Sequence, residues 1–324
     1  MAWLVASLLS SCGQPSTLTS SNSFAAAHAT AAAWWPKAES AFISGNPQTL
    51  SDLFTGSALD IARGQLTMAS LKGSKPKYPR PYRGVIVFGP SDPALTWFLA
   101  IIQYAPIDQD GRAQVVTMTA PGMIFTNTAG VWKVAAADVQ APIPHTVFGN
   151  GDSTLSGTDT DTHYITGASA VAGAYASYLN KLSAGQQPEV PFVTGINSFS
   201  WRFARIEWPP SSIAKAQFSF VVDTPLLVSY SIASGGSTKP PEIVLFVLRR
   251  AVTLTARQGC LVRRQGEFEW SDVVAPGSYR SLTLSSVSVI AATVPVNDGD
   301  TSQGRKVIDI SGRVDDVSAA GIRC

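Results

Sequence analysis

The sequence predicts an α+β fold made of two units, each a layer of helices on a curved antiparallel sheet, with the second unit richer in strands. Three observations lead to this prediction. Helical periodicity fills residues 24–66 and again residues 167–185, and strand-like alternation follows each of these stretches. Residues 143–166 carry many turn formers and no apolar period, so they separate the two stretches as a linker. The chain has 324 residues, enough for two domains of ordinary size.

The N-terminus, MAWLVASLLSSCGQPSTLTSSN, is interpreted as a secretion signal and a tether, residues 1–23. Its apolar run is too short to cross a bilayer, which takes about 20 apolar residues. Leu9-Ser10-Ser11-Cys12 resembles the lipobox of bacterial lipoproteins, which implies that the Cys12 thiol takes up lipid and becomes the new N-terminus. Such signals begin with a basic residue, but the first one here is Lys37, so we expect the true start codon to lie upstream. The alternative is a frayed apolar N-terminus with a chance cysteine.

Composition agrees with export and gives no electrostatic basis for nucleic-acid binding. Charged residues make up 14% of the chain, the net charge is +2, and Lys and Arg form no long block. If Cys12 carries lipid, Cys260 and Cys324 remain as a pair, and an exported protein can keep a disulfide. We expect that bridge, which the loop-entropy model values at about 4 kcal/mol. The alternative is two thiols that never meet.

The first unit, residues 24–142, opens with helices. Residues 25–33 are nearly all Ala, and Pro36 either kinks a longer helix or begins a second one. Gly45 ends this helical stretch. Asn46-Pro47 restarts the chain as an N-cap and a first helical residue, and a third helix starts near residues 57–60.

Strands follow the helices in the first unit. We expect them at residues 85–88, 95–104 and 114–119, and in a hairpin of residues 123–125 and 131–134. Helices first, a Gly-Asn-Pro break, then a sheet ending in Gly130-Val131-Trp132-Lys133-Val134 resembles the nuclear-transport-factor-2-like (ketosteroid-isomerase-like, cystatin-like) family. The resemblance covers about residues 24–140. It implies a cone, in which the sheet curves around a helix and leaves a mouth.

The second unit, residues 167–324, begins with one helix that ends at Gly185. Strands are expected at residues 199–203, 226–232, 243–255, 260–270 and 281–296. One helix followed by long strands looks like a second, diverged copy of the same cone-like plan. Tandem cones behind a lipobox resemble a group of uncharacterised envelope lipoproteins. Because the linker has few residues able to bury surface, we expect few contacts across it and two units that fold alone.

Catalytic and metal-binding motifs are weak throughout. The three histidines, His28, His145 and His163, have no Cys or acidic partner at metal spacing, so we expect no metal and no cofactor. Residues 167–171 lack the second glycine and the preceding strand of a nucleophile elbow, so we expect Ser169 to be a first-turn helix residue. No helix follows Gly235-Gly236, so these glycines do not form a phosphate cradle.

Three further groups of residues have a functional and a plain reading. Acid–base chemistry in a cone mouth would draw on Tyr82, Asp92, Tyr104 and Asp108. We favour the interpretation that these residues lie in solvated loops and have no catalytic role. An apolar pocket would draw on Trp34, Trp35, Phe42, Trp97 and Trp132, for which we favour core packing. A basic patch for anionic lipid or acidic cell-wall polymer would draw on Arg249, Arg250, Arg257, Arg263 and Arg264, for which we favour protection of strand edges by charge.

These inferences together predict a lipid-anchored binding or protein-interaction module on the extracytoplasmic face of the bacterial cell membrane, without enzymatic activity. The expected partners are the membrane, through the lipid anchor, and an envelope protein or a cell-wall polymer, but not nucleic acid. The alternative is a small apolar-ligand-binding protein or an acid–base enzyme that uses a cone-shaped pocket. The oligomeric state and the identity of the ligand stay open.

Overall fold

The computed structural model describes residues 20–74, 85–90, 96–102, 122–139, 153–155, 162–186, 204–205, 211–231, 242–264, 271–294 and 309–324. The helices are α1 (Ser20–Ser44), α2 (Pro47–Leu53), α3 (Gly56–Leu71) and α4 (Thr162–Ser183). The strands are β1 (Val85–Pro90), β2 (Trp97–Ile102), β3 (Gly122–Thr128), β4 (Val131–Val139), β5 (Ser153–Leu155), β6 (Ala214–Ser231), β7 (Glu242–Ala256), β8 (Leu261–Arg263), β9 (Gly277–Val294) and β10 (Asp309–Arg323). The α+β class predicted from the sequence is confirmed.

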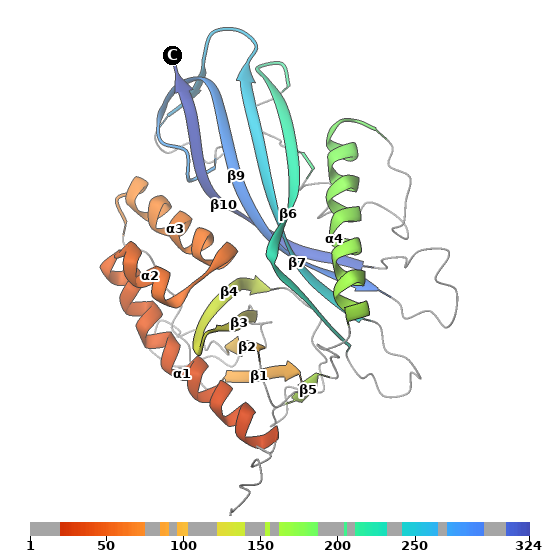
Figure 1. Ribbon diagram of the computed structural model, residues 1–324. Coiled ribbons are helices and arrows are strands. Elements are labelled where there is room, and N and C mark those ends of the chain that lie inside the picture. The colour runs from red at the N-terminus through yellow and green to blue at the C-terminus, as the bar shows by residue number, and fades with distance from the viewer. Residues whose placement is uncertain are drawn as a thin grey trace, which may run out of the picture.

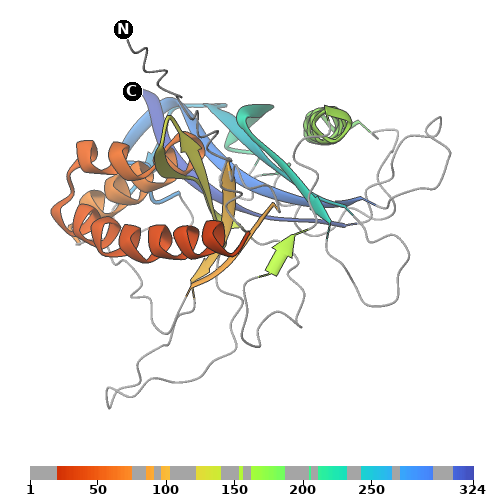
Figure 2. The same ribbon diagram turned by 60° about the horizontal axis from the view of Figure 1, so that its bottom comes forward.

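The elements stack in four layers, which Figures 1 and 2 show from two directions. Helices α1–α3 cover one face of the first sheet, whose strand order is β4-β3-β2-β1-β5. The other face of that sheet packs on the second sheet, of order β10-β9-β7-β6. Helix α4 covers the far face of the second sheet. The layers are therefore helices, sheet, sheet and helix.

Helix α1 runs without interruption through Pro36, so the longer of the two helices left open by the sequence is the one that forms. Its buried stripe recurs at three- and four-residue spacing: Ala27, Ala31, Trp34, Ala38 and Ala41. Gly45 follows with a φ of 65°, a left-handed conformation that glycine adopts at helix ends. The predicted restart is also confirmed, since the Asn46 side chain accepts from the Gln48 N–H at 2.9 Å and Pro47 is the first helical residue.

The first sheet is antiparallel from β4 to β1, and the short β5 pairs with β1 in parallel. Its predicted hairpin is confirmed, and the turn lies at Ala129 and Gly130, both with positive φ. Aromatic rings fill the space between this sheet and the helices. The Trp34 ring meets Phe125 edge-on at 5.5 Å, and Phe98 stacks on Phe125 at 4.6 Å between ring centroids. The strand expected at residues 114–119 lies outside the described residues.

The second sheet is built from long strands, of which β6 and β9 have 18 residues each. Strand β7 lies between β6 and β9. In its first half, residues 243–248 are all buried, so apolar side chains point from both faces of the strand into packed layers. Strand β10 pairs with β9 along almost its whole length, although the sequence analysis predicted no strand there. In the region predicted as one strand over residues 260–270, the described part is the three-residue β8, which pairs with β9. Residues 199–203 lie outside the described part of the chain.

The two sheets share an apolar cluster, which the sequence analysis did not anticipate. Residues from before the linker, among them Ile61, Trp97 and Ile124, pack with Leu245 and Val289 from after it. All five side chains are nearly inaccessible to solvent. The expectation of few contacts across the linker does not hold for the described residues.

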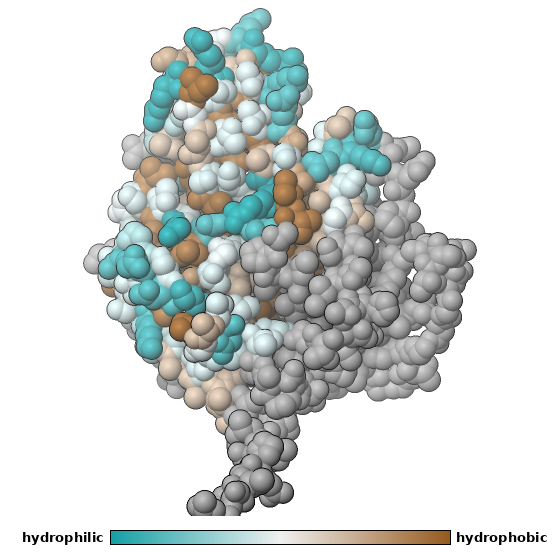
Figure 3. All heavy atoms as spheres, in the orientation of Figure 1, coloured by the Kyte–Doolittle hydropathy of each residue, from teal (hydrophilic) through white to brown (hydrophobic). Residues whose placement is uncertain are grey.

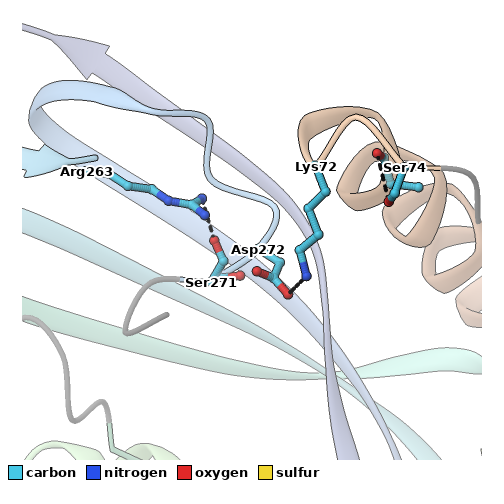
Figure 4. Close-up of polar contacts among 6 residues, drawn as sticks. Lys72, Ser74, Arg263, Ser271 and Asp272 are labelled. Atoms are coloured by element: carbon cyan, nitrogen blue, oxygen red, sulfur yellow. Dashed lines mark hydrogen bonds and ion pairs between the residues drawn. The ribbon is translucent and has the colours of Figure 1, made fainter. Parts of the chain in front are cut away.

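Helix α3 fastens the first unit to the edge strand β10 of the second. A Cβ atom added to Gly64 would lie 2.9 Å from the Val317 Cα, so the helix and the strand backbone meet closely at this point. At the end of the helix, Lys72 Nζ lies 2.6 Å from the Asp272 carboxylate, as Figure 4 shows. In the same view, Arg263 donates to the Ser271 carbonyl at 2.8 Å and holds the loop that carries Asp272.

Candidate functional site

A cavity of about 190 Å³ opens where α3, the first sheet and the second sheet meet. Its lining comes from all three elements: Thr55, Gly56, Ser57, Thr126, Thr128, Ala135, Asp223 and Val247. The wall is thus formed by hydroxyl groups and small side chains, with one carboxylate. A cavity with a few convergent polar groups is the default candidate for a ligand site.

Local structure explains why the hydroxyl groups face this space. Thr55 is the N-cap residue of α3, and its backbone N–H bonds to the Val134 carbonyl at 2.9 Å, which fixes the helix start against β4. The Ser57 hydroxyl donates to the Ala135 carbonyl at 2.9 Å, so Ser57 is already engaged. The hydroxyls of Thr55, Thr126 and Thr128 have no hydrogen-bond partner among the described residues. These three threonines are therefore free to bond a ligand.

The carboxylate in the wall belongs to Asp223, which lies where the β6–β7 pairing breaks. Asp223 pairs with Val247, and the next paired residue on β6 is Leu227. Its side chain is only 14% exposed, and a buried carboxylate needs a partner. That partner is Arg249, whose Nη2 lies 2.7 Å from Asp223 and also 2.7 Å from Asp60 on α3.

Arg249 thus joins the two units at the rim of the cavity. Burial lowers the pKa of Arg249, but its hydrogen bonds and charge contacts with Asp60 and Asp223 outweigh that effect, so the pKa is raised above its ordinary value. Two carboxylates share one guanidinium, which leaves the cluster with a formal charge of −1. The rim therefore favours ligand groups that donate hydrogen bonds or carry positive charge.

A second charged cluster lies on the opposite face of the second sheet, away from the cavity. The Arg250 Nη2 donates to the Ser286 hydroxyl at 3.1 Å and lies 3.6 Å from Asp316, and Ser286 donates to the same carboxylate. Burial lowers the pKa of Arg250 by more than the charge of Asp316 raises it, so the net direction is downward. This cluster connects β7, β9 and β10 and has the character of a structural network.

Of the groups weighed from the sequence, the acid–base set cannot be placed. Tyr82, Asp92, Tyr104, Asp108, His145 and Gly235-Gly236 lie outside the described residues. Residues 167–171 lie inside α4, so Ser169 is a helix residue as expected, but it is not in the first turn, because α4 begins at Thr162, within the residues predicted as a linker. His28 lies on α1 and His163 on α4, on different elements of the fold.

The aromatic set fills the core instead of lining a pocket. Trp34, Trp35 and Phe42 pack between the helices and the first sheet, with Trp132 partly buried against them. Trp97 points the other way, into the cluster between the sheets. This outcome agrees with the core reading favoured from the sequence.

The basic patch drawn from the sequence is wrong in its membership. Arg249 is engaged by two carboxylates, Arg250 is 10% exposed, and Arg263 is buried and donates to Ser271. Arg257 and Arg264 are exposed. Alternation on β7 sends Arg249 and Arg250 to opposite faces of one sheet, so the two residues cannot belong to one surface patch.

Cys260 and Cys324 lie together as a disulfide, with their Cα atoms 6.3 Å apart. The bridge ties the end of the last strand to the residue that precedes β8. Cys12 lies outside the described residues, so its lipidation stays a prediction.

The cavity residues escaped the sequence analysis, since none of them belongs to a motif. Asp60 belongs only to the predicted start of the third helix, residues 57–60. A local signal did exist for Asp223, which is an acid within a long apolar strand followed by Thr-Pro. Such an interruption indicates a break in strand pairing.

Comparisons with protein-family models, with curated proteins and with solved structures found no match for this chain. Within the described part of the chain, no three His, Cys, Asp or Glu side chains lie close enough together to hold a metal ion. The helices of the same part include none that is long and apolar enough to span a membrane.

Proposed function

We propose that this protein is a binding module that holds a small polar ligand in the cavity between its two sheets. The single observation that carries the proposal is the lining itself: three threonine hydroxyls, with no hydrogen-bond partner in the described part of the chain, line a cavity of about 190 Å³ together with a carboxylate. A space of this size accepts only a small molecule. Hydroxyls both donate and accept hydrogen bonds, whereas Asp223 accepts them, so the fitting ligand is a small polyol or an amino alcohol.

The ion pair with Arg249 supports binding over catalysis. A carboxylate held at 2.7 Å by a guanidinium is positioned to orient a ligand, and its charge is offset by that partner. The alternative function, an acid–base enzyme, is favoured by one observation, which is that Asp223 lies in the cavity wall at all. In that case a bound ligand would be turned over, and Asp223→Asn would bind it without reaction.

The test is a thermal-unfolding screen with glycerol and ethanolamine as probes. A ligand present at 100 times its Kd stabilises a protein by about 2.7 kcal/mol, which raises Tm measurably. We expect Asp223→Asn and Thr126→Val to remove the rise with ethanolamine. The matched control is Asp272→Asn, which removes another ion-paired acid away from the cavity. An unchanged rise in the two cavity variants would contradict the proposed site.

Location forms the second part of the proposal: an extracytoplasmic protein anchored to the cell membrane by lipid on Cys12. The Cys260–Cys324 pair supports export, since disulfides persist in oxidising compartments. Mass spectrometry of the protein made in a bacterial host should show a diacylglyceryl group on an N-terminal Cys12. Cys12→Ser should move the protein from the membrane to the soluble fraction. A protein that retains Met1 and carries no lipid would contradict the anchor.

The finer fold assignment belongs to the same proposal. Three helices followed by a sheet that ends in the β3–β4 hairpin support a nuclear-transport-factor-2-like plan for the first unit. One helix lying on a sheet of long strands supports a diverged second copy. An experimental structure that includes residues 103–121 tests this, because the family plan needs a further sheet strand in that interval.

A further inference from the structure

Exposed cations gather at the end of the second sheet that holds the C-terminus. They are Lys215 near the start of β6, Arg257 just after β7, Arg280 near the start of β9 and Arg323 at the end of β10. The register places these positions at one end of the sheet, since Lys215 pairs with Thr255, Thr255 with Ser281 and Ser281 with Ile322. Lys215 and Arg323 lie on the two edge strands of this end, and Arg280 alternates to the opposite face from Ser281. Among the described residues, none of the four has a carboxylate partner.

Two of these guanidinium groups are held in place with donors to spare. Arg257 Nε donates to the Ser211 carbonyl at 2.6 Å, and both of its terminal nitrogens, which have no partner among the residues that the structure describes, can donate to an anion. Arg323 lies 4.8 Å from the centre of the Tyr279 ring, and its Nη1 donates to the Pro276 carbonyl at 3.2 Å. The nearby acid Asp272 is engaged by Lys72. Groups held this way lose little side-chain entropy when they meet a phosphate.

Branched apolar side chains stand exposed at the same end. Ile213 is 43% exposed, Val262 51% and Ile322 65%. They come from the residue before β6, from β8 and from β10, around the cations just named. Figure 3 shows hydrophobic atoms among hydrophilic ones on the visible side of this end. Large apolar side chains exposed together with unpaired cations are typical of a surface that meets the headgroup region of a membrane.

We propose that this end of the second sheet docks on an anionic lipid bilayer. The cations contact the phosphate groups of the lipids, while Ile213, Val262 and Ile322 enter the boundary between headgroups and acyl chains. Charge complementarity favours anionic lipid, since each Lys or Arg near such a surface is attracted to it. The exposed apolar side chains favour a bilayer over a soluble polyanion, which offers them no apolar partner.

This docking surface would act as a second membrane contact beside the lipid on Cys12. Its role as a second contact depends on the proposed Cys12 anchor. The segment from Cys12 to Ser20 reaches at most roughly 28 Å. Strand β9, with 18 residues, is roughly 60 Å long and begins at the docking surface. Figure 1 shows the start of α1 and the C-terminus at opposite ends of the protein. Both contacts therefore reach one bilayer only when the second sheet lies along it.

The experiment is co-sedimentation of the unlipidated full chain, Cys12→Ser, with vesicles of phosphatidylglycerol and phosphatidylcholine in equal parts. We expect binding to these vesicles, no binding to pure phosphatidylcholine, and weakening by salt. Lys215→Glu/Arg280→Glu should weaken binding at least tenfold, and Ile322→Ser should weaken it at low salt as well. The control Lys37→Glu/Lys181→Glu makes the same charge change at exposed positions on α1 and α4, and should bind like the parent.

Three results would overturn the proposal. They are equal binding to pure phosphatidylcholine, equal loss in the control variant, and tighter binding of soluble polygalacturonate or duplex DNA than of the vesicles. Circular dichroism of each variant establishes that it is folded. Because the protein tested carries no lipid, failure here is separate from failure of the Cys12 anchor, which mass spectrometry reads. It is likewise separate from the cavity, whose variants are tested by ligand-dependent Tm.

Discussion

Gly64 on α3 is the position where a single added methyl group tests how the two units are joined. In Gly64→Ala the new Cβ would lie 2.9 Å from the Val317 Cα and 3.1 Å from the carbonyl oxygens of Asp316 and Val317. These are backbone atoms of a paired strand, so they cannot turn aside as a flexible side chain does. Helix α3 must move away from β10, and the packing of Ile61 between the sheets moves with it.

The magnitude follows from two opposing effects. Overpacking a tight contact costs about 1–3 kcal/mol. Alanine in place of glycine in a helix interior returns about 0.5–1 kcal/mol. We expect Gly64→Ala to lower the free energy of unfolding by about 0–2.5 kcal/mol in total.

The chain offers a matched control in Gly173, which lies inside α4, where no described atom beyond the neighbouring residues and the helix's own backbone is within 4 Å of an added Cβ. Gly173→Ala should therefore gain about 0.5–1 kcal/mol from helix propensity alone. Urea unfolding followed by circular dichroism measures both variants against the parent. If Gly64→Ala proves as stable as Gly173→Ala, then α3 does not press on β10 and the reasoning fails.

Three further predictions concern separate parts of the fold. Cys260→Ala/Cys324→Ala should lower the free energy of unfolding by about 2–5 kcal/mol, measured against the parent under oxidising conditions, and reduction of the parent should give the same loss. Leu245→Ala, at a fully buried position between the sheets, should cost about 2–5 kcal/mol by urea unfolding, while a loss below 1 kcal/mol would mean that the sheets separate easily. Asn46→Ala should cost about 1 kcal/mol through the lost bond to the Gln48 N–H, and Asn46→Ser, which keeps a capping oxygen, should restore most of it.

Local signals allowed the sequence to predict much of the first unit. A Gly-Asn-Pro break can be predicted from its residue types alone, because each of them favours one backbone conformation at a helix end or start. The β3–β4 hairpin is likewise predicted by the alternation of apolar and polar residues on both sides of a turn. These features require no knowledge of what packs against them, and the structure has them where they were expected.

Strand β10 shows why the rest could not be predicted. Its sequence, DISGRVDDVSAAGIR, is rich in Asp, Ser, Ala and Gly, which strands disfavour or tolerate poorly. It is a strand because β9 offers a long edge to pair with, α3 packs against it near Val317, and the disulfide holds its end. All three reasons are tertiary, so no window of the sequence contains them.

The candidate site escaped prediction for the same reason. Asp223 and Arg249 meet through the pairing of β6 with β7, and Asp60 reaches them only because α3 packs against the second sheet. Each is an ordinary charged residue in its own segment. Their distances become meaningful once the two sheets are known to pack face to face.

That packing leads to the sharpest conflict between sequence and structure, which concerns the domain boundary. The linker composition predicts that residues 24–142 and 167–324 fold alone. Separating them would expose the branched side chains that β7 and β9 place between the sheets, Ile243, Leu245, Val247, Val287 and Val289. Each costs about 1.5–3 kcal/mol when exposed, and their sum is comparable to the whole stability of a domain, about 5–15 kcal/mol. From the structure we therefore expect the full chain to unfold in one transition and each isolated half to lack a cooperative one. Two separate calorimetric transitions in the full chain, matching those of the halves, would favour the linker argument and show that the shared cluster contributes little.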